Sequence, residues 1–537
     1  MGRSSAAARP VSRRGMIKAT AAGALASLVT PRTSAGAASE SLARLGAGTA
    51  APPGQGVDPA FGRLDEFVRE AMGRYDVPGV AVGVLHEGRE YTSGYGVTNR
   101  DAPLPVDAQT LFQAGSITKT YTATLIMRLV ERGQVDLDAP VRTYLPDLQL
   151  ADEAVAEQVT VRQLLNHTAG WFGDYYGPPP AALQPTVWPW RGDDAEARYV
   201  ANMQYLPQLA PLGAMFGYNN AAVVLAGHLA EVVLGTTYEA ALTELVLRPL
   251  GMDRAYLFPE EVVSYPVAAG HRVGEDGVAQ VDPLWAFPRC VHPTGGLILS
   301  MADQLKYAWF HLGDGRAPDG TRLLAPSLLA EMRTARGPGL AASITANAEI
   351  YGGGVGWALE RIGGVQIVTH NGGWVGQEAL LALVPERQFA VAVFTNAVPD
   401  GGRLYYEIST WALAELAGLS QPLPPTRALP AARLAEYVGR YGVDVDVPGG
   451  GGQQQLLEVT RDGGGLRVTT LAQEPSDSPA ASEPEPPGPV ARLAFFRDDA
   501  ALVTTDDRTV LGADFVRDSS GRVGWMHWGA RVVPRLT

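Results

Sequence analysis

A hydroxyl and an amine that could activate it stand three positions apart, at Ser116 and Lys119, where a helical pattern begins. Side chains at this spacing lie on one face of a helix, about 5–6 Å apart at their Cβ atoms. A serine hydroxyl is a weak nucleophile until a nearby base takes its proton, and an uncharged lysine can be that base. Only three of the 43 basic residues are lysines, at Lys18, Lys119 and Lys306, and arginine cannot serve as such a base. The pair predicts an activated nucleophile, although surface helices also carry such pairs by chance.

A second pair of polar residues stands just before another predicted helix. Tyr218 could act as an acid or a base, because a phenol near a cationic lysine loses its proton more easily. Asn220 could hydrogen-bond a substrate amide. The alternative is a capped helix start, with Tyr218 packed in the core.

A third segment, His370-Asn371-Gly372-Gly373, follows an apolar strand. The two glycines allow close backbone approach, so the Gly373 N–H could form an oxyanion hole together with the N–H of Ser116. The alternative is a simple β-turn that carries a surface histidine.

Two neighbouring features are ambiguous. The stretch Phe172–Asp194 is rich in aromatic residues and proline, and could either roof a cleft or pack on its own surface. His167 is interpreted as a hydrogen-bonded core group, since buried polar groups are usually paired.

Hydrophobic patterns indicate the elements that must position these residues. Strands are predicted at 79–85, 365–369, 379–384 and 389–395, and helices at 116–131, 221–234 and 404–416. Strands at both ends with helices between them favour an α/β (α+β) fold, in which an antiparallel sheet is flanked by helices and carries a helical insert. Beyond residue 431 the signals are all β.

The composition narrows the function classes. A formal net charge of −13 argues against a nucleic-acid-binding protein, which needs a basic face. The single cysteine, Cys290, excludes a disulfide framework, and no two histidines stand at the spacing of an HExxH metal site. We therefore predict no metal and no other cofactor, and a small molecule or peptide as the substrate. The oligomeric state is left open.

The amino-terminal residues have the layout of an export signal. Arg13 and Arg14 precede a short apolar run, and Ala35-Gly36-Ala37 offers a cleavage site. This layout predicts a twin-arginine signal and a periplasmic or extracellular protein; the alternative is a disordered basic tail. No later apolar run is long enough to predict a transmembrane helix. The expected organisation is a signal, a linker, a large domain, a second linker and a β domain: 1–37, 38–60, 61–420, 421–430 and 431–537.

Together the three motifs resemble those of the class C β-lactamases and the penicillin-binding-protein-like serine hydrolases, which include S12-type peptidases. Ser116-x-x-Lys119, Tyr218-x-Asn220 and His370-x-Gly372 occur in that order and at similar spacing. Other similar segments, within residues 61–418, are Val77-Pro78-Gly79-Val80, Thr110-Leu111-Phe112, Leu164-Leu165-Asn166-His167-Thr168-Ala169-Gly170, Arg248-Pro249-Leu250-Gly251-Met252, and Thr294-Gly295-Gly296-Leu297 with Asp303.

The resemblance implies a β-lactamase/transpeptidase-like fold with an all-helical subdomain, followed by a smaller barrel-like domain. It also implies an acyl-enzyme. By role, the implied residues are an acylated serine, two proton carriers and two groups that orient the substrate: Ser116, Lys119, Tyr218, Asn220 and His370.

His370 departs from the Lys-Thr-Gly that penicillin-hydrolysing members of the family usually carry at this motif. An unperturbed imidazole has a pKa of about 6.5, so it loses much of its charge at neutral pH. We therefore expect inefficient β-lactam hydrolysis. The His-x-Gly motif is similar to that of D-aminopeptidases, DD-peptidases and esterases of the family, so the expected substrate is an ester or a D-amino-acid peptide. The alternative is a penicillin-binding or peptidoglycan-recognition module with little turnover.

Overall fold

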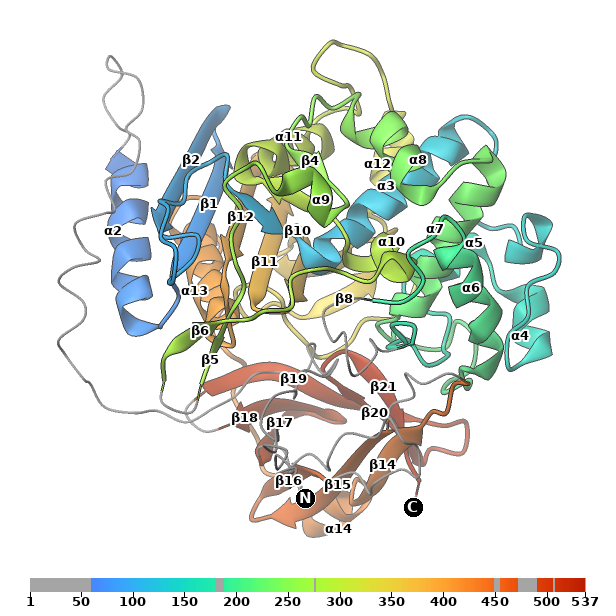
Figure 1. Ribbon diagram of the computed structural model, residues 1–537. Helices are drawn as coiled ribbons and strands as arrows, with labels where there is room; N and C mark the ends of the chain where they lie inside the picture. Colours follow the sequence, from blue (N-terminus) through green and yellow to red (C-terminus); the bar gives the residue numbers. More distant parts are fainter. Residues whose placement is uncertain are drawn as a thin grey trace, which may run out of the picture.

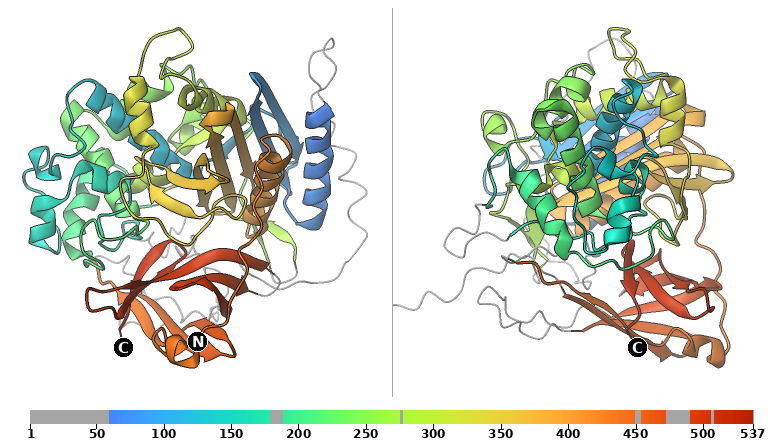
Figure 2. Two further views of the ribbon diagram at one scale, coloured as in Figure 1. Left: turned by 180° about the vertical axis from the view of Figure 1, so that it is seen from behind. Right: turned by 90° about the vertical axis from the view of Figure 1, so that its right-hand side faces the viewer.

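We describe a computed structural model of the chain, which consists of a sheet-and-helix part with a β-barrel below it (Figures 1 and 2). The described residues are 59–178, 188–274, 277–448, 454–471, 490–505 and 508–536. The expected export signal and most of the first linker lie outside these residues, as does part of the aromatic stretch.

A seven-stranded antiparallel sheet forms the centre of the larger part. The predicted strands all lie in this sheet. The order across it is β2 (Arg89–Gly96), β1 (Gly79–His86), β12 (Phe389–Thr395), β11 (Gln377–Val384), β10 (Val365–Trp374), β9 (Ala358–Ile362) and β8 (Ile350–Gly353). The inner strands β1 and β12 are almost wholly buried and read as continuous apolar runs, because helices cover both faces of the sheet.

Alternate residues of β1 enter two different cores. Val80 joins Leu64 of helix α2 (Pro59–Arg74) and Leu404 of α13 (Asp400–Glu415) in one buried cluster. Figure 1 shows α2 lying along the outer edge of this sheet. On the opposite face, Ala81 joins the cluster that contains residues of α11 (Met301–Leu312) and α3 (Thr118–Glu131). The period of two along the strand therefore divides the core into two layers.

The remaining helices form an all-helical region beside the sheet. They are α4 (Glu153–Gln158), α5 (Val161–Leu165), α6 (Ala195–Asn202), α7 (Asn220–Leu234), α8 (Tyr238–Leu242), α9 (Pro259–Val262), α10 (His292–Gly295) and α12 (Pro326–Met332). Helix α7 begins where Asn219 accepts a hydrogen bond from the backbone of Ala222, and it ends at Gly235 in the left-handed region, as the sequence predicts. Among the described helices, none alone has the length and apolar character to cross a membrane. Only the pair α7 and Tyr238–Leu247, bent by 81°, meets those criteria together.

Two small sheets connect these layers. One contains β3 (Leu111–Gln113), β7 (Ile298–Ser300) and β4 (Ala255–Tyr256), and the other contains β13 (Ala397–Val398), β5 (His271–Val273) and β6 (Ala279–Val281). Strand β3 leads directly into the turn that carries Ser116, so it sets where the nucleophile stands.

The C-terminal part is an eight-stranded antiparallel barrel preceded by α14 (Ala431–Ala435). Its strands follow chain order: β14 (Gly439–Asp444), β15 (Gln454–Asp462), β16 (Gly465–Thr470), β17 (Ala491–Arg497), β18 (Ala500–Thr505), β19 (Arg508–Arg517), β20 (Val523–Trp528) and β21 (Arg531–Pro534). The first and last strands meet where Tyr441 pairs with Arg535 and the Leu536 N–H donates to the Arg440 carbonyl. The interior is filled by side chains such as Tyr437, Phe495 and Phe515.

Candidate active site

Ser116 and Lys119 meet at the head of α3. The chain leaves β3, makes a 3-10 turn at Gly115–Ile117 and enters the helix. The Lys119 Nζ lies 3.0 Å from the Ser116 Oγ and donates a hydrogen bond to the Thr294 carbonyl, 2.8 Å away. Ser116 is only partly buried, so its hydroxyl stays open to a substrate. The arrangement aligns a base with a reachable nucleophile.

Burial favours the uncharged form of the Lys119 amine. Its side chain is 1% exposed, and among the described residues no carboxylate lies within ion-pair distance of it. The pKa of Lys119 is lowered well below its ordinary value, first by burial and then by the nearby charge of Arg531, while Asp174 acts in the opposite direction. Loss of solvent is therefore the dominant cause of the lowered pKa.

Tyr218 stands immediately before α7, with its ring against both basic side chains. The Lys119 Nζ lies 4.9 Å from the ring centroid, and the guanidinium carbon of Arg531 lies 4.7 Å from it. Burial raises the pKa of Tyr218, whereas a hydrogen bond with Ser116 and the charge of Arg531 lower it in part. This corrects the expectation of an easily ionised phenol: Lys119 is not the cation that would promote ionisation, so Tyr218 keeps its proton.

His167 packs against the ring of Tyr218. Its ring lies 4.6 Å from the Tyr218 ring, and its Nδ1 accepts a hydrogen bond from the Asn219 backbone. Burial, followed by the charges of nearby basic groups, lowers the pKa of His167 well below its usual value. His167 is therefore a neutral, hydrogen-bonded core group.

Asn220, the first residue of α7, is held by a network of polar contacts. Its Nδ2 donates to Asp174 Oδ1 at 2.8 Å and to the Tyr176 hydroxyl at 3.1 Å. Because a carboxylate only accepts hydrogen bonds, the amide nitrogen must face Asp174. Both amide hydrogens are thus engaged, and the Asn220 Oδ1 remains as an acceptor.

The predicted glycines lie against the nucleophile's backbone. A Cβ on Gly372 would lie 2.0 Å from the Ala114 carbonyl oxygen and 2.8 Å from the Ser116 nitrogen, and one on Gly115 would lie 2.6 Å from the Gly373 nitrogen. Real Cβ atoms do not approach so closely, so glycine is required here. The backbones that carry the Ser116 and Gly373 N–H groups therefore run side by side, as two oxyanion donors must.

His370 lies within β10, not in a turn. Strand β10 continues to Trp374 because residues 370–374 keep their pairing with β11. Burial, and then the proximity of Lys119, lowers the pKa of His370 to about 3. Its Nδ1 lies 2.5 Å from the Asn371 carbonyl oxygen, which fixes that nitrogen as the protonated one. His370 is thus neutral at physiological pH and offers no cation.

A cluster of aromatic rings, called here the aromatic wall, surrounds Trp374, which directly follows His370–Gly373 in β10. The Trp374 ring lies 4.4 Å from that of Phe287 and 6.2 Å from those of Tyr176 and Trp188. Tyr176 and Trp188 belong to the aromatic stretch, whereas the adjacent Tyr175 is buried in the core. Tyr176 and Trp188 thus belong to this wall while Tyr175 packs in the core, and residues 179–187 lie outside the described residues.

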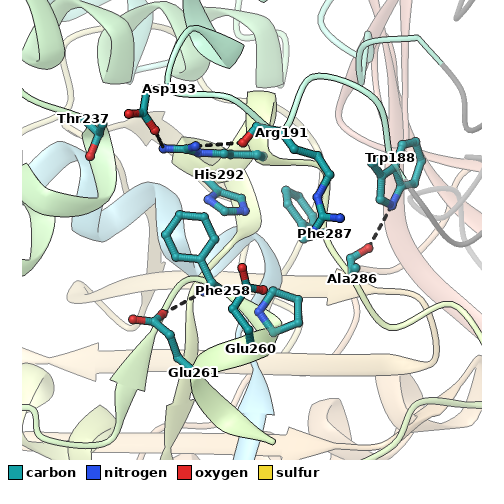
Figure 3. A pocket seen from close by; sticks show the side chains of 12 residues that line it. Trp188, Arg191, Asp193, Thr237, Phe258, Glu260, Glu261, Ala286, Phe287 and His292 are labelled. Atoms are coloured by element: carbon teal, nitrogen blue, oxygen red, sulfur yellow. Dashed lines mark hydrogen bonds and ion pairs between the residues drawn. The ribbon is translucent and has the colours of Figure 1, made fainter.

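Beyond this wall lies a cavity of about 550 Å³. Figure 3 shows Phe258, Phe287 and His292 around it, with Arg191 and Trp188 toward one end. His292 begins α10, the short helix whose Thr294 carbonyl accepts from Lys119. The cavity and the reactive pair thus both border α10. No group of three or more metal-ligating side chains occurs in the part of the chain that the structure describes.

Two residues of the site escaped sequence reasoning: Asp174 and Arg531. Arg531 follows the tip of the β20–β21 hairpin of the barrel, and its Nε and Nη2 atoms donate to the two carboxylate oxygens of Asp174 at 3.0 and 3.1 Å. The same tip contributes the Ala530 carbonyl, which accepts from the Tyr218 backbone N–H at 2.9 Å. The presence of Asp174 within an aromatic stretch was the only available signal.

Comparison with known proteins shows the family to which the chain belongs. The beta-lactamase family model matches residues 64–414. Penicillin-binding protein 4 of Amycolatopsis lactamdurans is 34% identical over 375 residues, which are 68% of this chain and 93% of that protein. The crystal structure of SurE, also solved with D-Leu, superposes with a TM-score of 0.65 and 26% identity over 89% of this chain and 99% of SurE. The octameric penicillin-binding protein homologue from Pyrococcus abyssi gives a TM-score of 0.59 and 27% identity over 88% and 99%.

The fold and the comparisons define a serine hydrolase superfamily with a mixed α/β core. Within it, the chain belongs to the beta-lactamase family, with class C β-lactamases and penicillin-binding protein homologues as its structural neighbours. The two compared structures also extend over most of the barrel, since they cover nearly nine-tenths of this chain.

Proposed function

We propose that the protein forms an acyl-enzyme on Ser116 and hydrolyses an ester or amide bond. The observation that carries this proposal is the 3.0 Å distance between the Lys119 Nζ and the Ser116 Oγ, at an amine that burial keeps neutral. A neutral amine next to a hydroxyl that is partly open to solvent is the combination that nucleophilic catalysis requires.

In the acylation step, the Ser116 Oγ bonds to the substrate carbonyl carbon while Lys119 takes the hydroxyl proton. The carbonyl oxygen becomes an oxyanion that the N–H groups of Ser116 and Gly373 stabilise. The bond to the leaving oxygen or nitrogen then breaks. The proton from Lys119 returns through Tyr218 to that atom, so both residues end as they began.

In the deacylation step, a water oxygen attacks the ester carbon and gives its proton to the same base. The bond between the carbonyl carbon and Oγ breaks, Ser116 recovers its proton and the acid is released. Tyr218 suits this relay as a neutral phenol, because it can donate one proton while accepting another.

The substrate preference follows from three features of the site. The Asn220 Oδ1 accepts an N–H, which favours an acyl part that carries an amine or amide near the reacting carbonyl. Trp374 and its neighbours offer an apolar surface. His370 has no charge for a β-lactam carboxylate. Together with the D-Leu complex of SurE, these features favour esters and amides of D-amino acids.

The test combines labelling with turnover. Intact mass after fluorophosphonate treatment should show one adduct on the wild type and none on Ser116→Ala. Labelling of Ser116→Ala, or none on the wild type, would refute the proposal. A panel of p-nitrophenyl esters, D-amino-acid amides, D-Ala-D-Ala peptides and nitrocefin then ranks the substrates.

A second candidate is a penicillin-binding module with little turnover, favoured by the 34% identical relative of that name. It predicts a stable adduct with labelled penicillin and no product release from any member of the panel. Rapid loss of the adduct would exclude it.

We also propose that the protein is exported by its twin-arginine segment. Replacing Arg13 and Arg14 together by lysine should retain the protein inside the producing cell, as fractionation and immunoblotting would show. Unchanged export of this variant would refute the proposal.

A further inference from the structure

The barrel holds the catalytic tyrosine at two points. At the hairpin tip, Ala530 adopts a φ of 64° and turns its carbonyl toward the Tyr218 N–H, while Arg531 places its guanidinium against the Tyr218 ring. A non-glycine residue in this region is uncommon and carries strain. The conformation of the tip therefore fits Tyr218 specifically, which a simple contact between two domains would not require.

Contacts around the tip make it rigid. The Trp525 Nε1 donates to the Leu209 carbonyl at 2.7 Å, and the His527 Nε2 lies 2.6 Å from the Phe216 carbonyl oxygen. Val532 packs so closely that a Cβ on Gly217 would lie 2.7 Å from its Cγ2. These contacts bracket Tyr218, so the hairpin cannot shift without moving the tyrosine.

Arg531 also controls the substrate-facing amide through Asp174. The Asp174 Oδ1 accepts from both the Arg531 Nη2 and the Asn220 Nδ2, so one carboxylate oxygen joins the barrel to the substrate site. The Arg531 Nη1 donates to the Gly529 carbonyl at 3.0 Å, which fixes the guanidinium plane within its own hairpin. Such a bidentate pair transmits orientation as well as charge.

We propose that the barrel is part of the active centre and that Arg531 is its positioning residue: it fixes Asn220 through Asp174 and holds a permanent positive charge beside Tyr218 and Lys119. This inference rests on the proposed function, because only an enzyme has an active centre. The titration of Lys119 that tests it needs no turnover.

The charges that act on Lys119 can be enumerated among the described residues. His167 and His370 are neutral, because burial lowers both pKa values. Tyr218 keeps its proton, because burial raises its pKa. Arg531, which favours the neutral amine, and Asp174, which favours the charged one, remain as the two opposed charges.

The chain's three lysines allow a direct measurement of this effect. Selective labelling with [ε-¹³C]lysine gives three resonances at most, and the Lys119 signal reports its protonation without any turnover. Arg531→Met should raise the pH at which Lys119 titrates by about one unit, since a like charge is lost. Asp174→Asn should lower it by a similar amount. The double variant should titrate close to the wild type.

Two controls separate this effect from loss of an interdomain contact. Arg497→Met removes another ion pair between the barrel and the larger part, with Glu349 at 2.6 Å, and should leave the Lys119 titration unchanged. The Lys306 resonance, beside Asp303, should not move in any variant. Arg531→Lys keeps the charge but loses the planar fork, so it should preserve the titration while raising KM for a D-amino-acid amide severalfold.

Equal titration of Lys119 in Arg531→Met and Arg497→Met would overturn the inference, as would shifts of the same sign in Arg531→Met and Asp174→Asn. If Arg531→Met does not fold, the downward shift in Asp174→Asn decides the question. Failure of the proposed function would instead show as an unlabelled wild-type Ser116, which leaves these titrations interpretable.

Discussion

The head of α3 and the tip of the β20–β21 hairpin each bring a basic side chain to the same tyrosine ring, and they do so in opposite charge states. Lys119 is buried without a carboxylate at ion-pair distance among the described residues, so its pKa is lowered and its neutral form is favoured. Arg531 is 16% exposed and forms a bidentate pair with Asp174, and it stays charged. Burial alone does not set the charge of a basic group; the partner and the chemical type decide it.

The two regions also differ in how they are built. The head of α3 depends on a turn that only glycines permit and on a helix packed within the main core. The barrel carries ordinary apolar side chains inside and places its contribution at a surface hairpin. A rigid barrel can thus place a single side chain, Arg531, at a site whose other residues belong to the larger part.

The largest effect should come from placing a permanently charged arginine at the head of α3, as the hairpin already has at Arg531. Lys119→Arg keeps the positive charge but removes the neutral base, so the rate of fluorophosphonate labelling should fall about a thousandfold. Labelling followed over time by intact mass measures this rate. Lys306→Arg is the matched control and should label normally; near-normal labelling of Lys119→Arg would mean that another group is the base.

Next in size is the effect of removing the phenol between the two regions. Tyr218→Phe keeps the ring against both basic side chains but cannot carry a proton, so kcat for an amide substrate should fall about a hundredfold. Tyr256→Phe, whose hydroxyl donates to the Asp253 carbonyl away from the site, should have no effect. If both variants turn over at the wild-type rate, Tyr218 only fills space.

A moderate effect should follow from adding a second cation beside Arg531. His370→Lys restores a charge for a substrate carboxylate, so labelling by benzylpenicillin relative to a neutral ester should rise about tenfold. His228→Lys is the control.

In the wild type the same ratio should stay flat between about pH 6 and pH 8, because the pKa of His370 is lowered to about 3 and only acid near that value would charge it. A wild-type ratio that rises toward pH 6 would show a titrating imidazole.

The smallest effect should come from loosening one contact of the hairpin. Trp525→Phe removes the N–H that donates to the Leu209 carbonyl and should cost about 1 kcal/mol of unfolding free energy. The urea midpoint measures this cost, and the labelling rate should change less than twofold. Trp309→Phe, which loses a bond to Glu90 far from the barrel, gives the comparison. A large loss of activity without loss of stability would assign Trp525 a direct part in the chemistry.

Local signals were enough to predict the sheet and the motif positions. Strands β1 and β12 are continuous apolar runs, and α7 is preceded by its cap, Asn219, and followed by its stop, Gly235. The same reasoning could not find Arg531, because its pairing with Asp174 spans 357 positions and arginines are common in this chain. It also misjudged the Tyr218 proton, since burial depends on the assembled core and not on neighbours in sequence.

The seam of the barrel gains a meaning from its position. The strand that begins at Arg531 is also the one that closes onto β14, through the pairing of Tyr441 with Arg535. On the proposed function, a lesion that opens this seam would withdraw Arg531, which lies on the same strand, from the proposed reaction centre. The pKa of Lys119 would then depend on whether the barrel is closed. Damage to the barrel could lower activity even where Ser116, Lys119 and Tyr218 are unchanged.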